Sequence, residues 1–248
     1  MRRHPLVLAY HGVGDVPLRR EPNGLFVRAD EVLKHVRQLR AWGYTLMTFG
    51  ALADRVAAGD ADGCGCITFD DGLADNVAAL TALGSPCTLF PVSGWLGAYH
   101  AEIPWARIVS PDELRSLADA GVEVGSHSHT HPDLSTLSYR EVRDELEASK
   151  RRLEEVLDRP VDVLAYPYGK ANGDTIQACR DVGFRAACRN SGQGSWADLH
   201  NLPRQDMNNG STMISLRLKR DDLYEPLVRQ LPFRAVRAVV RRVQLMTE

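Results

Sequence analysis

The sequence predicts an α/β protein whose parallel strands close into a barrel. Short apolar runs alternate with helical patterns along most of the 248 residues, which is typical of a parallel sheet covered by helices. Several of these runs end in polar residues: Tyr10-His11, Asp70-Asp71, Ser126-His127 and Tyr166-Pro167-Tyr168. The carboxyl ends of parallel strands meet on one face, where active sites are built. These polar residues come from many strands, whereas the site of an open sheet lies in a single crevice between two strands. The pattern therefore favours a barrel over an open sheet.

The strands are expected where apolar residues run together without helical spacing. These segments are residues 6–11, 66–71, 86–94, 122–127, 161–167 and 185–188. Such short and apolar runs are typical of strands that are buried on both faces.

The helices are expected where apolar residues recur every three or four positions before a glycine stop. Over residues 30–42, Leu33, Val36 and Leu39 form one stripe, and Gly43 follows. Capping boxes at residues 110–113 and 138–141 open two further helices. The remaining helical patterns cover residues 74–83, 175–181 and 223–246.

Composition sets limits on the class of protein. Apolar residues make up 44% and charged residues 25%, which excludes disordered, collagen-like and coiled-coil chains. The formal net charge of −2 gives no reason to expect nucleic acid as a partner. The first residues do not resemble a secretory signal, and no run approaches the roughly 20 apolar residues of a membrane span, so a cytoplasmic location is expected. The five scattered cysteines are expected to be reduced thiols.

Two adjacent carboxylates, Asp70 and Asp71, lie in the segment Thr-Phe-Asp-Asp-Gly at residues 68–72. Neighbouring anions repel each other, so one usually needs a cation, and the other can then act as a base. A solvated Asp-Asp-Gly turn is the alternative interpretation.

Three histidines, His127, His129 and His131, lie within five positions. The i, i+4 spacing of His127 and His131 can bring two imidazoles to one ion, whereas His129 would point elsewhere. Two imidazoles and one carboxylate leave coordination positions open for water and substrate, as a catalytic site requires. Together with the adjacent aspartates, the cluster favours a metal site over isolated structural histidines.

In this order, the segments TFDDG (68–72), SHSHTHP (126–132) and AYPYG (165–169) resemble the motifs of the polysaccharide deacetylases, the carbohydrate esterase family 4 or NodB-like group. The resemblance runs from about Leu6 to Arg204. It implies a distorted (β/α) barrel of about seven parallel strands in a single domain, and metal-dependent hydrolysis of an acetamido group on a sugar.

The resemblance also implies roles for individual residues. Asp70 resembles the catalytic base, and Asp71, His127 and His131 resemble the metal ligands. Tyr168 resembles the residue whose backbone N–H helps to bind the oxyanion. Zinc best suits two histidines and one aspartate, with cobalt, nickel or manganese as alternatives.

The sequence departs from the family pattern in three places. Ala165 replaces the usual arginine of the third motif, Trp196-Ala-Asp198 is a poor match to an Asp-Trp motif, and residues 215–223 lack the histidine of the late Leu-x-His motif. A subset resembling the biofilm poly-N-acetylglucosamine deacetylases instead begins with a strand that ends in histidine, as in a circular permutation. Because the first and last strands of a closed barrel are neighbours, we expect His11 to be the general acid; a histidine that caps the turn is the alternative.

Three further residues complete the expected site. Arg204 is the candidate cation that orients Asp70, with a surface arginine as the alternative. Trp95 follows a strand and Tyr166 ends one, and both are expected to contact the sugar. Ordinary core or rim packing is the alternative for Trp95.

The expected partner is an N-acetylated sugar or glycan. Removal of another acyl group or hydrolysis of a non-sugar C–N bond would need the same metal site, and a non-catalytic glycan-binding barrel is a further alternative.

The chain is expected to divide into a barrel over residues 1–210 and a helical extension over residues 211–248 that packs on the same domain. The extension carries a basic face, formed by Arg229, Arg234, Arg237, Arg241 and Arg242. This face could contact an anionic membrane surface weakly, but a packed helix with solvated arginines is the favoured interpretation.

Overall fold

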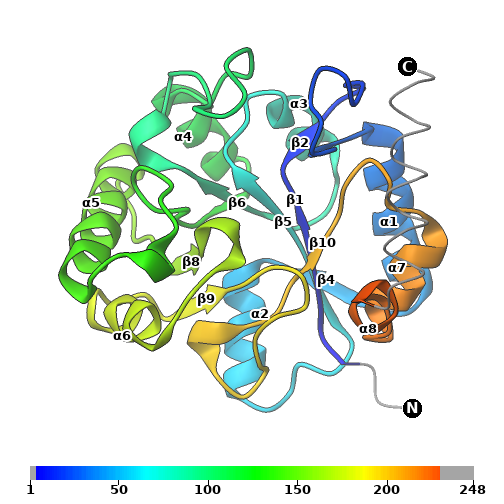
Figure 1. The fold of residues 1–248 in the computed structure, drawn as a ribbon. Helices are drawn as coiled ribbons and strands as arrows, with labels where there is room; N and C mark the ends of the chain where they lie inside the picture. The colour runs from blue at the N-terminus through cyan, green and yellow to red at the C-terminus, as the bar shows by residue number, and fades with distance from the viewer. Residues whose placement is uncertain (1–3, 230–248) are drawn as a thin grey trace.

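In the computed structural model, which describes residues 4–229, parallel strands run side by side around a barrel (Figure 1). The strands of the barrel are β1 (Leu6–Tyr10), β5 (Cys64–Asp71), β6 (Thr88–Pro91), β7 (Glu123–Val124), β8 (Val163–Ala165), β9 (Ala186–Cys188) and β10 (Gln205–Asp206). The first part of the barrel has the order β10-β1-β5-β6-β7, and β8 pairs with β9. Single parallel bridges, Ser126 with Leu164 and Cys188 with Leu202, join these two parts. The predicted barrel fold is therefore confirmed.

Smaller strands flank the barrel. β4 (Thr45–Met47) pairs with the first half of β5, and β2 (Gly12–Val13) pairs with β3 (Phe26–Val27) beyond the end of β1. The sequence pattern predicts none of these three short strands.

Helices surround the strands (Figure 1). They are α1 (Ala29–Ala41), α2 (Phe49–Ala57), α3 (Asn76–Ala82), α4 (Pro111–Asp119), α5 (Tyr139–Leu157), α6 (Gly173–Asp181), α7 (Met213–Arg220) and α8 (Tyr224–Arg229). Both predicted capping boxes are present, at the starts of α4 and α5. Helix α2 was not predicted from the sequence. It has a glycine, Gly50, in its first turn, and glycine disfavours a helix; the Thr48 side chain caps this one.

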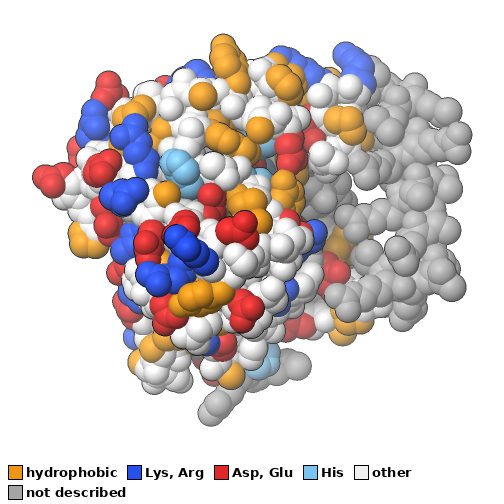
Figure 2. Space-filling view, turned by 60° about the vertical axis from the view of Figure 1, so that its left-hand side comes forward, with side chains coloured by type: hydrophobic (Ala, Val, Ile, Leu, Met, Phe, Trp, Pro, Cys, Tyr) orange, Lys and Arg blue, Asp and Glu red, His pale blue; other side chains and the backbone are white. Residues whose placement is uncertain are grey.

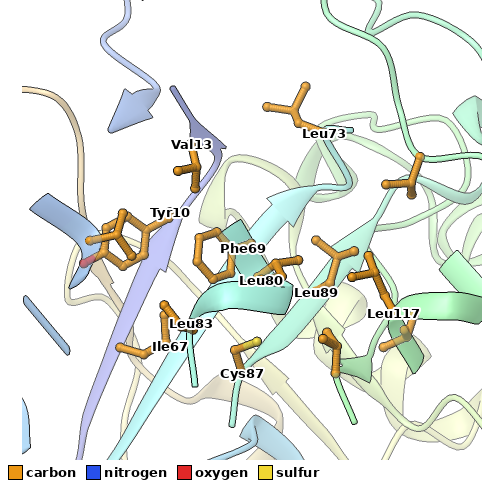
Figure 3. Close-up of a cluster of buried hydrophobic side chains, with 14 of the residues drawn as sticks. Tyr10, Val13, Ile67, Phe69, Leu73, Leu80, Leu83, Cys87, Leu89 and Leu117 are labelled. Atoms are coloured by element: carbon orange, nitrogen blue, oxygen red, sulfur yellow. The ribbon is translucent and has the colours of Figure 1, made fainter. Parts of the chain in front are cut away.

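The core has an inner and an outer part because successive side chains of a strand point to opposite faces. Cys64 and Cys66 of β5 belong to a buried cluster with residues of β1, β6, β8 and β9, so this cluster fills the inside of the barrel. Ile67 and Phe69 belong to the outer core together with side chains of α3 and α4, as Figure 3 shows. All five cysteines are buried and free.

The outer surface of α5 carries charges of both signs. Arg143 pairs with Glu147, and Lys150 pairs with Glu154, each at i, i+4 spacing. In the view of Figure 2, basic and acidic side chains are interspersed over the left-hand part of the surface. This arrangement is typical of a solvated helix face.

The described part of the C-terminal extension contacts the barrel through α7. Leu216 is fully buried in the outer core, and the Lys219 ammonium donates to the backbone oxygen of Asp206. The division at residue 210 stays a prediction. The arginines at 234, 237, 241 and 242, and the side chain of Arg229, lie outside the described residues. No helix in residues 4–229 is both long and apolar enough to span a bilayer.

Candidate metal and catalytic site

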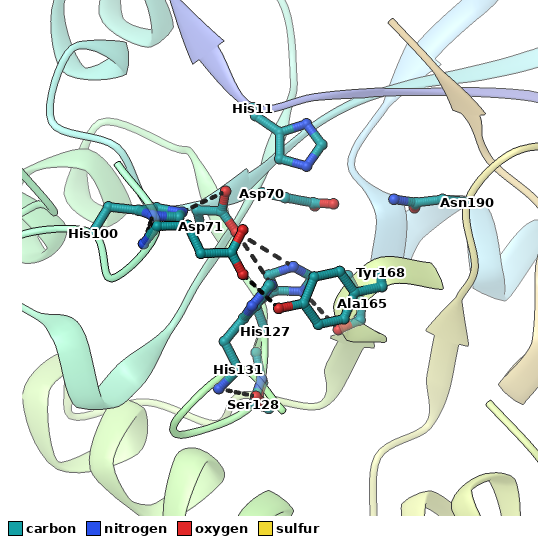
Figure 4. Close-up of polar contacts among 12 residues, drawn as sticks. His11, Asp70, Asp71, His100, His127, Ser128, His131, Ala165, Tyr168 and Asn190 are labelled. Atoms are coloured by element: carbon teal, nitrogen blue, oxygen red, sulfur yellow. Dashed lines mark hydrogen bonds and ion pairs between the residues drawn. The ribbon is translucent and has the colours of Figure 1, made fainter. Parts of the chain in front are cut away.

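Strand β5 delivers both acidic residues of the site. The two-residue period of a strand would send Asp70 and Asp71 to opposite faces. Asp71, however, has a φ of 66°, in the left-handed region. The backbone therefore turns at this residue, and both carboxylates lie in the same site (Figure 4). Aspartate is among the residues that adopt this conformation most readily.

Asp70 forms a buried pair with Arg204. Nη1 and Nη2 of the guanidinium each donate to one carboxylate oxygen at 2.7 Å, and neither side chain is exposed. The other N–H groups of Arg204 donate to Thr68, Asn190 and the backbone oxygen of Arg189. Every guanidinium donor thus has an acceptor, which a buried arginine requires.

The pKa of Asp70 reflects this pair. Burial alone would raise the pKa of the carboxyl group, but the charge of Arg204 and its hydrogen bonds outweigh burial and bring the pKa below 3.8. Asp70 is therefore ionised at neutral pH.

A tight turn after β7 carries His127 and His131. Ser128 and His131 both have positive φ, at 66° and 63°. Helix α5 holds the turn in place: the Glu145 carboxylate accepts the N–H groups of His129 and Thr130, and the Ser149 hydroxyl donates to the backbone oxygen of Ser128. The His129 ring faces Ser93 instead, at 2.9 Å from the hydroxyl.

The two imidazoles converge on Asp71. Nε2 of His127 and Nε2 of His131 each lie 3.6 Å from Asp71 Oδ1, and one ligand atom of each residue lies within 4.8 Å of the others. His127 Nδ1 is 2.8 Å from the carbonyl of Ala165. A carbonyl only accepts, so the proton is on Nδ1 and, in the neutral ring, the Nε2 lone pair faces Asp71.

These three residues fit a divalent metal ion. Asp71 Oδ1 is buried and accepts no hydrogen bond from the described residues, although buried carboxylate oxygens are costly to leave without one. Two ligands at about 2.1 Å from an ion in a tetrahedral site lie about 3.4 Å apart, close to the separations from Asp71. A cation would satisfy the orphaned oxygen and both lone pairs.

The protonation states agree with such a site. Burial, together with the neighbouring His127, lowers the pKa of His131 to about 3, so this ring is neutral at pH 7. Burial would raise the pKa of Asp71, but the hydrogen bond from His100 and the nearby imidazoles bring it below its ordinary value. Neutral imidazoles and an ionised carboxylate are the forms that bind metals.

The Tyr168 ring packs against the ring of His131. Tyr168 belongs to the 3-10 helix η3 (Pro167–Gly169), has a φ of 57°, and its ring centroid is 4.6 Å from that of His131. The Tyr168 N–H donates to no residue in the described part of the chain. It is therefore available to a ligand, as the predicted oxyanion role requires.

Backbone strain is concentrated in this site. Of the seven non-glycine residues with positive φ in residues 4–229, four lie here: Asp71, Ser128, His131 and Tyr168. Conformations of this kind cost about 1–3 kcal/mol each and are typically found at functional sites.

His11 follows β1 and lies on the other side of Asp70 from His127 in Figure 4. Its imidazole forms no hydrogen bond with a residue in the described ranges, while Asn76 Nδ2 donates to its backbone oxygen at 2.6 Å. The same Asn76 accepts the N–H of Val13 at 2.8 Å. The buried asparagine thus fixes the backbone on both sides of the turn and leaves the His11 ring free.

The two predicted sugar contacts have different environments. Trp95, at the end of the 3-10 helix η1 (Ser93–Trp95), is half-buried, with its ring 5.4 Å from that of His131. It borders the site, and its contact with a sugar stays a prediction. The prediction for Tyr166 is wrong: its side chain is fully buried in the core between β8, α5 and α6, and its hydroxyl donates to the backbone oxygen of His200.

Several residues that support the site were not predicted from the sequence. They are Thr68, Asn76, His100, Glu145 and Asn190. His100 is the one among them that touches a predicted metal ligand, with Nε2 3.3 Å from Asp71 Oδ2. It lies in a loop without a recognisable pattern, and an isolated histidine gives no signal of its own.

The fold and this geometry define an α/β barrel with a candidate metal-binding site at the carboxyl ends of its strands. The family model of the polysaccharide deacetylases matches residues 59–187, which include both aspartates, the histidine turn and Tyr168. The chain belongs to the polysaccharide deacetylase family.

Individual relatives are distant. The polysaccharide deacetylase homologue YxkH of Bacillus subtilis is 24% identical over 185 residues, covering 72% of this chain and 62% of YxkH. A chitooligosaccharide deacetylase of Bradyrhizobium is 29% identical over 137 residues, covering 53% of this chain and 58% of that protein. The chain thus spans about 60% of the length of each of these two relatives.

Solved structures share the fold. The deacetylase PplD of Streptococcus pyogenes, solved with acetate, superposes with a TM-score of 0.75 at 20% identity, over 89% of this chain and 99% of PplD. At this identity, the likeness supports the barrel architecture alone.

Proposed function

We propose that this chain is a metal-dependent hydrolase that removes the N-acetyl group from an amino sugar or glycan, with Asp71, His127 and His131 as the metal ligands. The observation that carries this proposal is the buried Asp71 Oδ1, which accepts no hydrogen bond from the described residues and lies 3.6 Å from two imidazole nitrogens. A divalent ion held by these three residues, Zn²⁺ in our proposal, would polarise an amide carbonyl and lower the pKa of water.

The chain's own residues supply the proton transfers. Asp70, ionised and oriented by Arg204, accepts a proton from the water molecule that attacks the acetyl carbon. The Tyr168 N–H donates to the carbonyl oxygen as negative charge develops on it, an interaction worth about 3–4 kcal/mol in comparable sites.

The reaction is complete when the C–N bond breaks. An amine leaves poorly unless it is protonated, and His11, on the far side of Asp70, donates that proton to the leaving nitrogen. Water thus adds to the acetyl group, and the products are acetate and the free amino sugar. The family and the chitooligosaccharide deacetylase relative support this substrate class.

The test is acetate release from N-acetylglucosamine oligomers, measured before and after chelation and after Zn²⁺ is added back. We expect activity to disappear with the metal and to return with Zn²⁺. Acetate release that survives complete metal removal would contradict the mechanism.

The same assay distinguishes the alternatives. A panel of N-formyl, N-acetyl and longer N-acyl glycosides, together with non-sugar amides, identifies the acyl group and the acceptor. Glycan binding by the metal-loaded protein without any turnover would indicate a non-catalytic barrel.

A further inference from the structure

His100 is a buried histidine outside the family's three motifs, and its tautomer is fixed by the backbone. It lies in the loop between η1 and α4, and its side chain is 2% exposed. Nδ1 accepts the N–H groups of Glu102 and Ile103, at 3.0 and 3.1 Å. Two amide donors on one ring nitrogen require a lone pair there, so Nε2 is the nitrogen that carries a proton.

The protonated Nε2 faces Asp71. It donates to Oδ2 at 3.3 Å, as the dashed line in Figure 4 shows. Oδ1, the other carboxylate oxygen, is the one that faces His127 and His131. An Nε2 that holds a proton cannot be a metal ligand, so His100 is no fourth member of the cluster.

We propose that His100 is a positioning residue for the metal site: its hydrogen bond occupies Asp71 Oδ2 and presents Oδ1 alone to the ion. This inference rests on the proposed function, since it needs a metal held by Asp71. Without the bond, the carboxylate is free to rotate about its χ2 torsion, or to bring both oxygens to the metal. Hydrogen bonds to ligating carboxylates orient them in this way in metal sites generally.

The loop around His100 is tied to the site at a second point. The Trp95 ring packs against both His100 and His131, with centroid distances of 4.9 and 5.4 Å. The Glu102 carboxylate accepts the hydroxyl of Tyr168 at 2.6 Å, so one loop contacts residues on two sides of the cluster. These contacts fix the position of the loop relative to the metal ligands, as a positioning role requires.

Replacements of His100 can separate its two hydrogen-bonding functions. In His100→Asn, the side-chain oxygen can replace Nδ1 as the acceptor of the loop amides, but the side chain is too short to reach Asp71. In His100→Gln, the amide nitrogen can still donate to Asp71. His100→Phe preserves the ring volume without the donor, and it serves as a second test if the Asn variant does not fold.

The readouts are the Zn²⁺ affinity, measured by competition with a chromophoric chelator, and the visible absorption spectrum of the Co²⁺-loaded protein. We expect the Asn and Phe variants to bind Zn²⁺ about 10–100-fold more weakly and to change the Co²⁺ spectrum. The Gln variant should stay close to the wild type. His35→Asn, which alters a buried histidine away from the site, is the control and should leave both readouts unchanged.

Folded Asn or Phe variants with wild-type Zn²⁺ affinity and a wild-type Co²⁺ spectrum would overturn the role of His100 and leave the proposed function intact. A wild-type protein that binds neither ion would overturn the metal site itself, and the role of His100 with it.

Discussion

Arg204 and Asp70 face each other as a bidentate pair with both N···O distances at 2.7 Å and no exposed surface on either side chain. The pair joins the end of β5 to the segment just before β10, so it links parts of the chain 134 residues apart. A base that must stay ionised inside a protein needs such a partner, because burial alone favours its neutral form.

We expect Arg204→Gln to destabilise the fold by about 3–5 kcal/mol, since it leaves a buried carboxylate without its cation. The pKa of Asp70 should rise, because burial is then no longer opposed, and the acid limb of the kcat/KM profile should move to higher pH. Urea unfolding and the pH–rate profile measure the two effects. Arg204→Lys is the matched variant: it retains the positive charge but loses the bidentate hydrogen bonds to Asp70. An unchanged acid limb in Arg204→Gln would contradict the assignment of Asp70 as the base.

Asp70→Asn should abolish most of the turnover without loss of metal. The amide cannot accept a proton from water, and loss of a general base typically lowers kcat by about 10²–10⁴-fold. Metal analysis and acetate release, measured on the same preparation, provide the check. Asp71→Asn is the contrasting variant and should lose the metal. Metal loss in Asp70→Asn would indicate that Asp70, too, is a ligand.

His11→Gln should affect substrates according to their leaving group. Amide hydrolysis needs a protonated amine, so deacetylation of N-acetylglucosamine oligomers should fall by about 10²–10⁴-fold. Hydrolysis of 4-nitrophenyl acetate, whose phenolate leaves without a proton, should change little. Equal losses on both substrates would contradict the role of His11 as the general acid.

His35 should make the protein sensitive to acid. Burial lowers the pKa of His35 to about 4, from 6.5 for an ordinary histidine, so between these pH values the unfolded chain binds a proton that the native state does not. Stability therefore falls as the pH decreases from about 6.5 to about 4, by roughly 3 kcal/mol at most. The loss of unfolding free energy from pH 7 to pH 4.5 should be smaller in His35→Asn, which can still hydrogen-bond to Tyr10. An identical loss in both proteins would contradict this assignment.

Gly94→Ala should weaken metal binding from outside the ligand set. A Cβ at Gly94 would lie 2.5 Å from the backbone oxygen of His129, in the middle of the histidine turn. The turn must then move, so we expect lower Zn²⁺ affinity in a protein that is still folded. Gly173→Ala is the control, because no atom lies within 4 Å of the added Cβ. Wild-type Zn²⁺ affinity in Gly94→Ala would show that the turn tolerates the shift.

Much of the fold was predictable because it depends on local patterns. The apolar runs gave most of the barrel strands, and the capping boxes gave α4 and α5. The short strands β2 and β3 have too few residues for a pattern, and the start of helix α2 is obscured by Gly50 in its first turn. Their positions depend on packing against distant parts of the chain.

The site was predictable where its residues stand close together in sequence. The adjacent aspartates and the histidine turn carry a recognisable spacing, and the structure brings Asp71, His127 and His131 together. His100 and Asn190 act through contacts between loops, which no spacing encodes. Tyr166 was wrongly predicted although a signal existed: it lies two positions after Leu164 of β8, and both side chains pack in one buried cluster with residues of α5 and α6.

The left-handed residues of the site also limit how robust this protein can be. Each has an unfavourable backbone angle, and three of them, Asp71, His131 and Tyr168, carry groups that the proposed reaction uses, so the barrel is less stable than its architecture would allow. Substitutions intended to raise heat resistance should avoid these positions. They should begin at glycines without positive φ and with open space around them, such as Gly173, where alanine has the higher helix propensity and lies away from the proposed site.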